Sequence, residues 1–208
     1  MSDVGAIDTL PLFPLRSVLF PGGLLQLKIF EARYLDLMAQ CLRTREPFGV
    51  VALTHGGEVR NATEAVHFEP VGVLAELIDC DSPGAGLMQV RCRGLQRFHC
   101  TADAVTHADG LWVAPAQQLP GDPPMVPAQD HASTVAALQR AIDTLDAQGN
   151  HPFLPPWQLD DAGWVANRWC ELLPISVTAR QKLMELDDPL MRLTLVHEFL
   201  QQHEVVKD

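Results

Sequence analysis

The sequence predicts an α+β protein in which a β-rich amino-terminal part precedes a helical carboxy-terminal part. Over residues 10–117, short apolar runs alternate with glycine- and proline-containing turns, a pattern typical of strands. Beyond residue 128, apolar side chains recur every three or four positions, which is typical of helices. Between the two parts, LPGDPPMVP (119–127) holds too much proline for regular structure. We therefore expect a β domain over 1–120, a proline-rich linker over 121–127 and a helical bundle over 128–208.

The apolar runs of the first part predict the strands of a small barrel or sandwich. The first two, Leu10 to Leu15 and Leu24 to Phe30, are connected through Phe20-Pro21-Gly22-Gly23. This is a turn sequence, because proline fixes one backbone angle and glycine permits positive φ. The remaining runs are Phe48 to Leu53, Pro70 to Cys80, Leu87 to Cys92, Gln96 to Ala102 and Leu111 to Gln117.

One segment within this β region, about 30–45, has helical rather than strand periodicity. Its apolar residues recur at three- and four-residue spacing, so a helix places them on one face, and Pro47 ends the pattern. We expect a single helix inserted into the β domain. The residues expected to pack from it are Phe30, Tyr34, Leu37, Met38, Cys41 and Leu42.

The helical part contains recognisable start and stop signals. A first apolar stripe ends at Gly149, and a second helical segment covers Trp164 to Leu173. Ser176 is a candidate cap for a third helix through Leu186, and Asp188 followed by Pro189 is a start signal for a fourth, to about Glu204. The stripe of the first helix consists of Val135, Leu138, Ile142 and Leu145.

Composition narrows the classes of function. The 208 residues carry a formal net charge of −11 with lysine only at positions 28, 182 and 207, so a nucleic-acid backbone is repelled over most of the surface. The sequence has no secretory leader and no run of about 18 apolar residues, and we expect a cytoplasmic protein. The five cysteines are scattered, which favours small buried side chains over a zinc or redox centre.

A search for chemistry finds no catalytic, cofactor-binding or metal-ligating set. There is no phosphate-binding glycine loop and no Gly-x-Ser-x-Gly nucleophile elbow. His197 and His203 are six positions apart, which places them on different faces of a helix rather than around one metal ion. Ser176 with Lys182 is better explained as a helix cap and a solvated lysine than as a Ser-Lys dyad.

Residues 10–38, LPLFPLRSVLFPGGLLQLKIFEARYLDLM, resemble the start of the LON domain, the amino-terminal substrate-recognition domain of Lon proteases. The strand FEPVGVLAELI (68–78), the strand residues Gly94, Arg97 and Phe98, and the helical segment 173–200 resemble later parts of the bacterial members. The resemblance therefore covers nearly the whole chain. In the first segment it rests on Leu12, Pro14, Leu15, Phe20, Pro21, Gly22, Phe30, Glu31, Arg33 and Tyr34.

The resemblance implies a PUA-like small β barrel with an inserted helix, followed by a helical bundle, and a role in holding protein substrates. The sequence reaches Asp208 without the ATPase and Ser-Lys peptidase of Lon, so we expect a non-catalytic module that binds unfolded or partner proteins. A peptide is expected at an edge strand of the barrel or in the groove between barrel and bundle. The partner, the contacting residues and the oligomeric state stay open.

Two alternatives remain from the sequence. PUA-like folds elsewhere bind RNA, and Arg91, Arg93 and Arg97 are expected to alternate along a strand as a small basic patch. An enzyme with an unrecognised site is the second alternative, and a concave pocket with converging ionisable groups would favour it.

Overall fold

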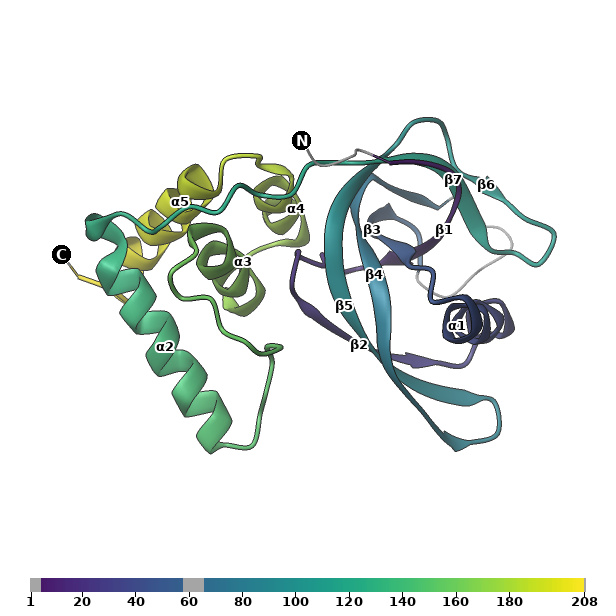
Figure 1. The fold of residues 1–208 in the computed structure, drawn as a ribbon, viewed down its shortest axis with the longest axis horizontal. Coiled ribbons are helices and arrows are strands. Elements are labelled where there is room, and N and C mark those ends of the chain that lie inside the picture. Colours follow the sequence, from purple (N-terminus) through teal and green to yellow (C-terminus); the bar gives the residue numbers. More distant parts are fainter. Residues whose placement is uncertain (1–4, 58–65, 208) are drawn as a thin grey trace. The chain divides into compact units, whose positions relative to one another are not determined.

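The computed structural model describes residues 5–57 and 66–207, and within them the protein is a mixed α/β structure (Figure 1). The chain forms two compact units, Met1–Gly121 and Asp122–Asp208. The first is rich in β structure and contains one helix, and the second is helical. Each unit has its own buried residues.

The described strands of the first unit form one sheet in the order β2-β5-β4-β3-β1-β7-β6. An additional pairing of β5 with β7 closes β5, β4, β3, β1 and β7 into a ring. The β1–β3 pairing is parallel and the other pairings are antiparallel. The strands are β1 (Ala6–Leu15), β2 (Leu24–Ile29), β3 (Phe48–His55), β4 (His67–Gly84), β5 (Leu87–Cys100), β6 (Val105–Thr106) and β7 (Trp112–Gln118).

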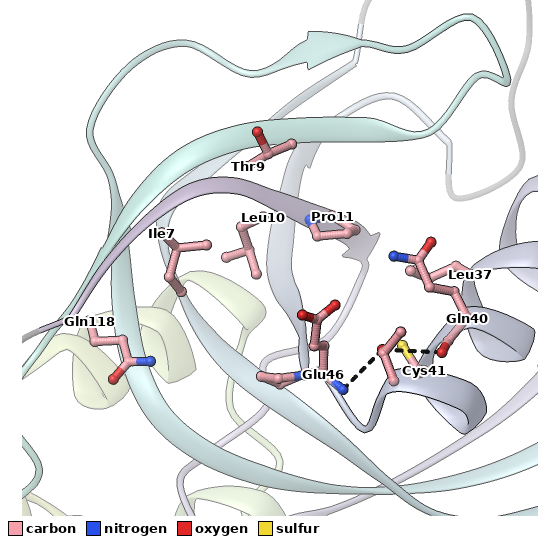
Figure 2. A pocket seen from close by; sticks show the side chains of 11 residues that line it. Ile7, Thr9, Leu10, Pro11, Leu37, Gln40, Cys41, Glu46 and Gln118 are labelled. Carbon is pink, nitrogen blue, oxygen red and sulfur yellow. Dashed lines mark hydrogen bonds between the residues drawn. The ribbon is translucent and has the colours of Figure 1, made fainter.

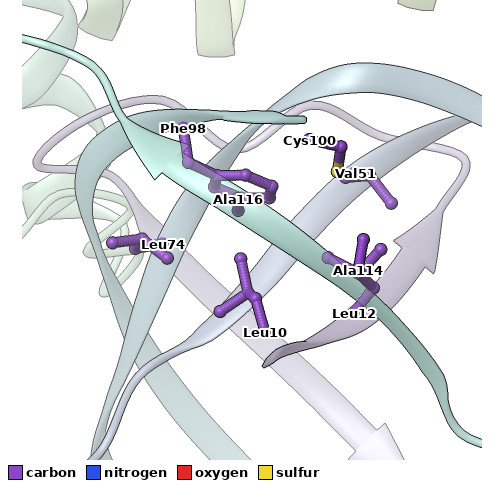
Figure 3. Packing of buried hydrophobic residues seen from close by; sticks show 8 residues of the cluster. All are labelled: Leu10, Leu12, Val51, Leu74, Phe98, Cys100, Ala114 and Ala116. Carbon is purple, nitrogen blue, oxygen red and sulfur yellow. The ribbon is translucent and has the colours of Figure 1, made fainter. Parts of the chain in front are cut away.

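The core of this unit receives apolar side chains from every strand of the ring (Figure 3). Phe98 of β5 is fully buried, and two glycines make room for its ring. A Cβ atom built at Gly49 would lie 2.6 Å from Phe98 Cζ, and one built at Gly72 would lie 2.2 Å from the Val50 carbonyl oxygen. Because interiors are close-packed, glycine is required where the backbone and Phe98 approach this closely. The core cluster consists of Leu10, Leu12, Val51, Leu74, Phe98, Cys100, Ala114 and Ala116.

The strand β5 differs from the sequence prediction, which divided it into two runs, 87–92 and 96–102. The structure has one strand, and Gly94 in its middle exchanges backbone hydrogen bonds with the Phe20–Gly23 turn: Gly22 N–H donates to its carbonyl at 2.8 Å, and its N–H donates to the Gly23 carbonyl at 2.9 Å. The predicted runs end at Cys92 and begin again at Gln96, whereas Gly94 lies within one continuous strand and its lack of a side chain lets the turn approach the strand backbone. The two-residue strand β6 was not predicted.

The inserted helix α1 (Ala32–Thr44) buries Tyr34, Leu37, Met38 and Cys41. The packing expected for Phe30 and Leu42 is wrong, because these side chains are 60% and 41% exposed. Phe30 precedes the first helical residue and therefore does not follow the helical period. Leu42 is turned about 100° from Cys41, beyond the edge of the buried face.

The start of α1 is fixed by the polar residues of the Phe-Glu-x-Arg-Tyr segment. Arg33 forms an ion pair with Glu31 at 2.9 Å and donates a hydrogen bond to the Gly110 carbonyl at 3.0 Å. The Tyr34 ring stacks on Phe13 of β1, with ring centroids 3.9 Å apart. These contacts hold the helix against the β structure. Glu31, Arg33 and Tyr34 therefore each have a structural role.

The second unit contains η1 (Gln129–His131), α2 (Ala132–Ala147), α3 (Ala162–Leu172), α4 (Val177–Glu185) and α5 (Pro189–Gln202). The start signals of its last two helices are confirmed: the Ser176 hydroxyl accepts from Ala179 N–H at 3.1 Å, and the Asp188 carboxylate accepts from the first turn of α5. Asp161 caps α3 in the same way. The sequence therefore identifies these helix starts through residues that satisfy otherwise free N–H groups.

The proline-rich segment has no regular structure, yet its second half is bonded to the helical unit. The Asp122 carboxylate forms an ion pair with Arg192 of α5, with Oδ2 and Nη1 2.6 Å apart. The Met125 carbonyl accepts a hydrogen bond from Ala162 N–H at 2.7 Å. These bonds attach residues 122–125 to the second unit.

Two histidines of the second unit lie in contact between the start of α2 and helix α5. The rings of His131 and His197 have centroids 5.4 Å apart. His197 Nδ1 shares a hydrogen bond with Thr134 Oγ1 at 2.7 Å, and His131 Nε2 lies 3.3 Å from Thr194 Oγ1. Burial, and then the neighbouring His197, lowers the pKa of His131 below its ordinary value of 6.5, while Asp130 acts in the opposite direction.

This histidine pair predicts an acid-sensitive stability. Because the pKa of His131 is lower in the folded state, the unfolded state binds more protons below about pH 6.5, and stability falls as the pH falls through that value. We expect the urea midpoint, followed by tryptophan fluorescence, to be lower at pH 5 than at pH 7.5. His131→Gln should reduce this difference, and the exposed His151→Gln should retain it. An unchanged difference in His131→Gln would show that other groups cause the pH dependence.

Candidate functional site

A pocket of about 280 Å³ lies in the first unit, between the first half of β1 and the second half of α1 (Figure 2). The end of β7 and the turn that leads from α1 into β3 complete its wall. The described residues that line it are Ile7, Thr9, Leu10, Pro11, Leu37, Gln40, Cys41, Thr44, Glu46, Pro47 and Gln118.

The pocket forms where the pairing of β1 with β3 stops. β1 pairs with β7 from Ala6 to Leu12, but with β3 only from Leu12 to Leu15. Among the described strands, the stretch 6–11 of β1 is therefore paired on one side only. The chain that enters β3 comes from α1 through Glu46 and Pro47, and the space between this turn and β1 remains open.

The open side of β1 is poorly suited to adding another strand. Pro11 has no backbone N–H to donate, and the pairing of β1 with β7 shifts register between Ile7 and Leu10, which marks a bulge. Proline and bulges are the features by which edge strands resist pairing with another chain. The site therefore favours a ligand that inserts side chains over one that extends the sheet.

The pocket has an apolar floor and a polar rim. Leu10, Leu37 and Cys41 are buried beneath it, whereas the rim residues Gln40 and Glu46 are exposed. Figure 2 shows the Glu46 side chain extending toward β1. Small-molecule sites usually enclose about 300–1,000 Å³, so this pocket of about 280 Å³ lies at the small end and has room for one or two side chains.

The turn that carries Glu46 is held by hydrogen bonds to the end of α1. The Thr44 hydroxyl donates to the Gln40 carbonyl at 3.2 Å and accepts from Glu46 N–H at 3.2 Å (Figure 2). Arg45 at the end of the helix adopts the left-handed conformation, and its N–H donates to the Cys41 carbonyl at 2.9 Å. Glu46 is thus positioned by the helix end, while its carboxylate has no ion-pair partner among the described residues.

Burial disfavours the thiolate form of the cysteine in the pocket. Burial raises the pKa of Cys41 to about 11, and the nearby Glu46 contributes in the same direction. Burial likewise raises the pKa of Cys92 and Cys170 to about 12 and that of Cys100 to about 11. A reactive cysteine needs a lowered pKa, because the thiolate is the attacking species.

The residues that the sequence suggested for catalysis or metal binding make structural contacts. Ser176 caps α4, and its hydroxyl accepts a backbone hydrogen bond. His197 is buried against Thr134, whereas His203 is exposed and hydrogen-bonds to the Phe199 carbonyl at 2.8 Å. In residues 5–57 and 66–207 no three histidine, cysteine or acidic side chains are grouped as a metal site.

The arginine patch expected for RNA binding does not form. Arg97 is only 3% exposed, because β5 contains one extra residue between Gly94 and Arg97 and the side chains beyond it exchange faces. Arg91 remains exposed but lies 4.0 Å from Asp79, in a polar hollow that also contains Asp81. Asp79 and Asp81 offset the charges of Arg91 and of Lys28, which also lines this hollow.

No helix in the described part of the chain is long and apolar enough to cross a membrane.

Comparison with known proteins identifies a matching protein family and similar solved structures. The family model of the ATP-dependent protease La (LON) substrate-binding domain matches residues 9–202. A Lon N-terminal domain protein from Xanthomonas campestris is 32% identical, with a TM-score of 0.71, over 92% of this chain and 98% of that one. The N-terminal domain of the Mycobacterium avium complex Lon protease shares the fold at 12% identity, with a TM-score of 0.61, over 94% of this chain and 100% of that one. No curated protein matches.

Proposed function

The chain belongs to the LON substrate-binding domain family, and from this premise we propose that it binds unfolded segments of other proteins and does not cleave them. The family match extends over residues 9–202, and the Xanthomonas campestris Lon N-terminal domain protein aligns along nearly its whole length. The family description names substrate binding, a function that requires a recognition surface but no reacting group. The raised cysteine pKa values and the capping role of Ser176 agree with this proposal.

The proposal assigns a separate role to each part of the chain. We take the strand ring of the first unit as a PUA-like barrel over 1–120 that carries the recognition site. We take 121–127 as the linker, 128–208 as a bundle that extends the domain, and the cytoplasm as its location. The strand pairings support the barrel, because β5 pairs with both β4 and β7 and so closes the ring.

The pocket beside β1 is the proposed binding site, and its construction is the observation on which this assignment depends. It combines a buried apolar floor with exposed polar groups at the rim, the arrangement by which a site holds an apolar side chain and contacts the adjacent backbone. Unfolded proteins expose the aliphatic side chains that folded proteins bury. The pocket therefore distinguishes an unfolded segment from a folded surface.

Filling the pocket is expected to weaken binding of an unfolded protein. Gln40→Trp places an indole at the rim from an exposed position on α1, while Ala39→Trp places the same side chain on the same helix outside the lining. Burying one aliphatic side chain contributes about 1.5–3 kcal/mol, so Gln40→Trp should weaken affinity at least about tenfold and Ala39→Trp little. Fluorescence anisotropy with labelled, reduced casein measures both.

Two results would contradict the proposed function. If wild type, Gln40→Trp and Ala39→Trp bind reduced casein equally, the pocket is not the binding site. If the wild type does not bind reduced casein, the proposed function is wrong. The same mixtures, supplied with ATP and Mg²⁺ and separated on a gel, report cleavage. Casein that remains intact agrees with binding alone, whereas cleavage that survives further purification would contradict it.

A further inference from the structure

The polar rim of the pocket carries charge of one sign. Glu46 is the only charged side chain among the described lining residues, and the other polar members are the neutral Thr9, Gln40, Thr44 and Gln118. The Glu46 carboxylate is exposed and has no ion-pair partner among the described residues. A ligand at this site therefore meets a negative charge that no lining group offsets.

From this asymmetry we infer that the pocket selects segments in which an aliphatic residue is followed or preceded by a lysine or arginine. The aliphatic side chain occupies the floor over Leu10, Leu37 and Cys41, and the basic side chain forms an ion pair with the Glu46 carboxylate. The inference rests on the proposed function, since it specifies which unfolded segments the same pocket prefers. It gives the occupant a definite chemistry: an extended, basic-apolar peptide.

Three features of the structure support this occupant. Glu46 lines the same pocket as Leu10, Leu37 and Cys41, so a cation beside its carboxylate remains close to a side chain inserted toward the floor. The Thr44 and Gln40 hydrogen bonds fix the turn, which reduces the conformational entropy lost when the ion pair forms. Pro11 and the bulge in β1 oppose strand addition, so side chains rather than backbone ladders determine the choice of segment.

The magnitude is bounded by the exposure of Glu46. An exposed ion pair contributes at most about fivefold in affinity and is weakened by salt. The apolar contact therefore determines most of the affinity, and the carboxylate determines preference among apolar segments. A larger effect of the basic residue would indicate attraction to the net charge of −11 of the whole chain.

The test uses the full chain and three labelled Gly-Ser peptides that are identical except for Lys, Gln or Glu after a Leu-Leu pair. We expect the Lys peptide to bind about two- to fivefold more tightly than the Gln peptide, and the Glu peptide more weakly, with the differences decreasing in 0.5 M salt. Glu46→Gln should remove the Lys preference. Glu76→Gln, which alters an exposed carboxylate on β4 outside the lining and changes the net charge equally, should keep it.

The outcomes separate this inference from the proposed function. If all three peptides bind equally and Gln40→Trp still weakens their binding, the pocket recognises apolar segments and the inference is wrong. If Glu76→Gln removes the Lys preference as fully as Glu46→Gln, the whole-chain charge causes it and the inference is also wrong. If neither the peptides nor reduced casein bind the wild type, the proposed function fails and the inference fails with it.

Discussion

Arg192→Met is expected to destabilise the helical unit by about 3–5 kcal/mol, because it removes one partner of a buried ion pair. Arg192 is almost fully buried in α5 and bonds to the Asp122 carboxylate, with Nη1 and Oδ2 2.6 Å apart, and to the Asn167 side chain at 2.9 Å. It also donates to the carbonyl oxygens of Leu183, at 2.9 Å, and Leu186. Methionine fills much of the volume but leaves these acceptors without their donor.

Urea unfolding followed by tryptophan fluorescence measures this loss, since three of the four tryptophans (positions 112, 157, 164 and 169) belong to the helical unit. Arg140→Met, on the exposed surface of α2, is the matched control and should change the free energy of unfolding by less than about 0.5 kcal/mol. Adding Asp122→Asn to Arg192→Met should recover part of the loss, because the carboxylate is then no longer left without its cation. If the losses in the free energy of unfolding caused by the two single substitutions add up in the double variant, the ion pair does not couple these residues.

Gly72→Ala is expected to destabilise the β unit by at least about 3 kcal/mol. The new Cβ would lie 2.2 Å from the Val50 carbonyl oxygen and 2.8 Å from Phe98 Cζ. The first neighbour belongs to the backbone of β3, so β3 and β4 must separate or shift where they pair. Far-UV circular dichroism during urea unfolding provides the measurement.

The control for this change lies on the same strand. Gly84, at the end of β4, has nothing within 4 Å of a Cβ built there, and Gly84→Ala should leave stability unchanged or slightly increased. Adding Phe98→Leu to Gly72→Ala relieves only the side-chain contact and should not restore stability. Full restoration by Phe98→Leu would show that the ring, rather than the Val50 carbonyl, limits the space at Gly72.

Local signals predicted much of the fold. Ser176 and Asp188 mark their helix starts correctly because a cap acts on N–H groups within three residues of itself. The helical face of α1 follows from spacing alone for Tyr34 and Leu37. Phe30 and Arg97 were misplaced because their positions depend on where a helix begins and where a strand bulges. Backbone geometry determines both, and the identities of these residues do not encode it.

The candidate site was beyond sequence reasoning for a similar reason. Its walls come from β1, the end of α1 and Gln118, which are brought together only by the long-range pairing of β1 with β3 and β7. No periodicity connects Leu10 with Glu46, and neither residue has a spacing typical of a motif. The resemblance to the LON domain predicted a protein-binding role for this chain, but the sequence contains no signal that marks the pocket beside β1.

The closed strand ring has a consequence for self-association. An open sheet edge can pair with aggregation-prone strands of other chains. In the described sheet, ring closure leaves only β2 and the two-residue β6 as terminal strands. β2 carries the charged Lys28, and the open stretch of β1 contains Pro11. The described sheet thus offers few unpaired edges at which strands of another chain could add.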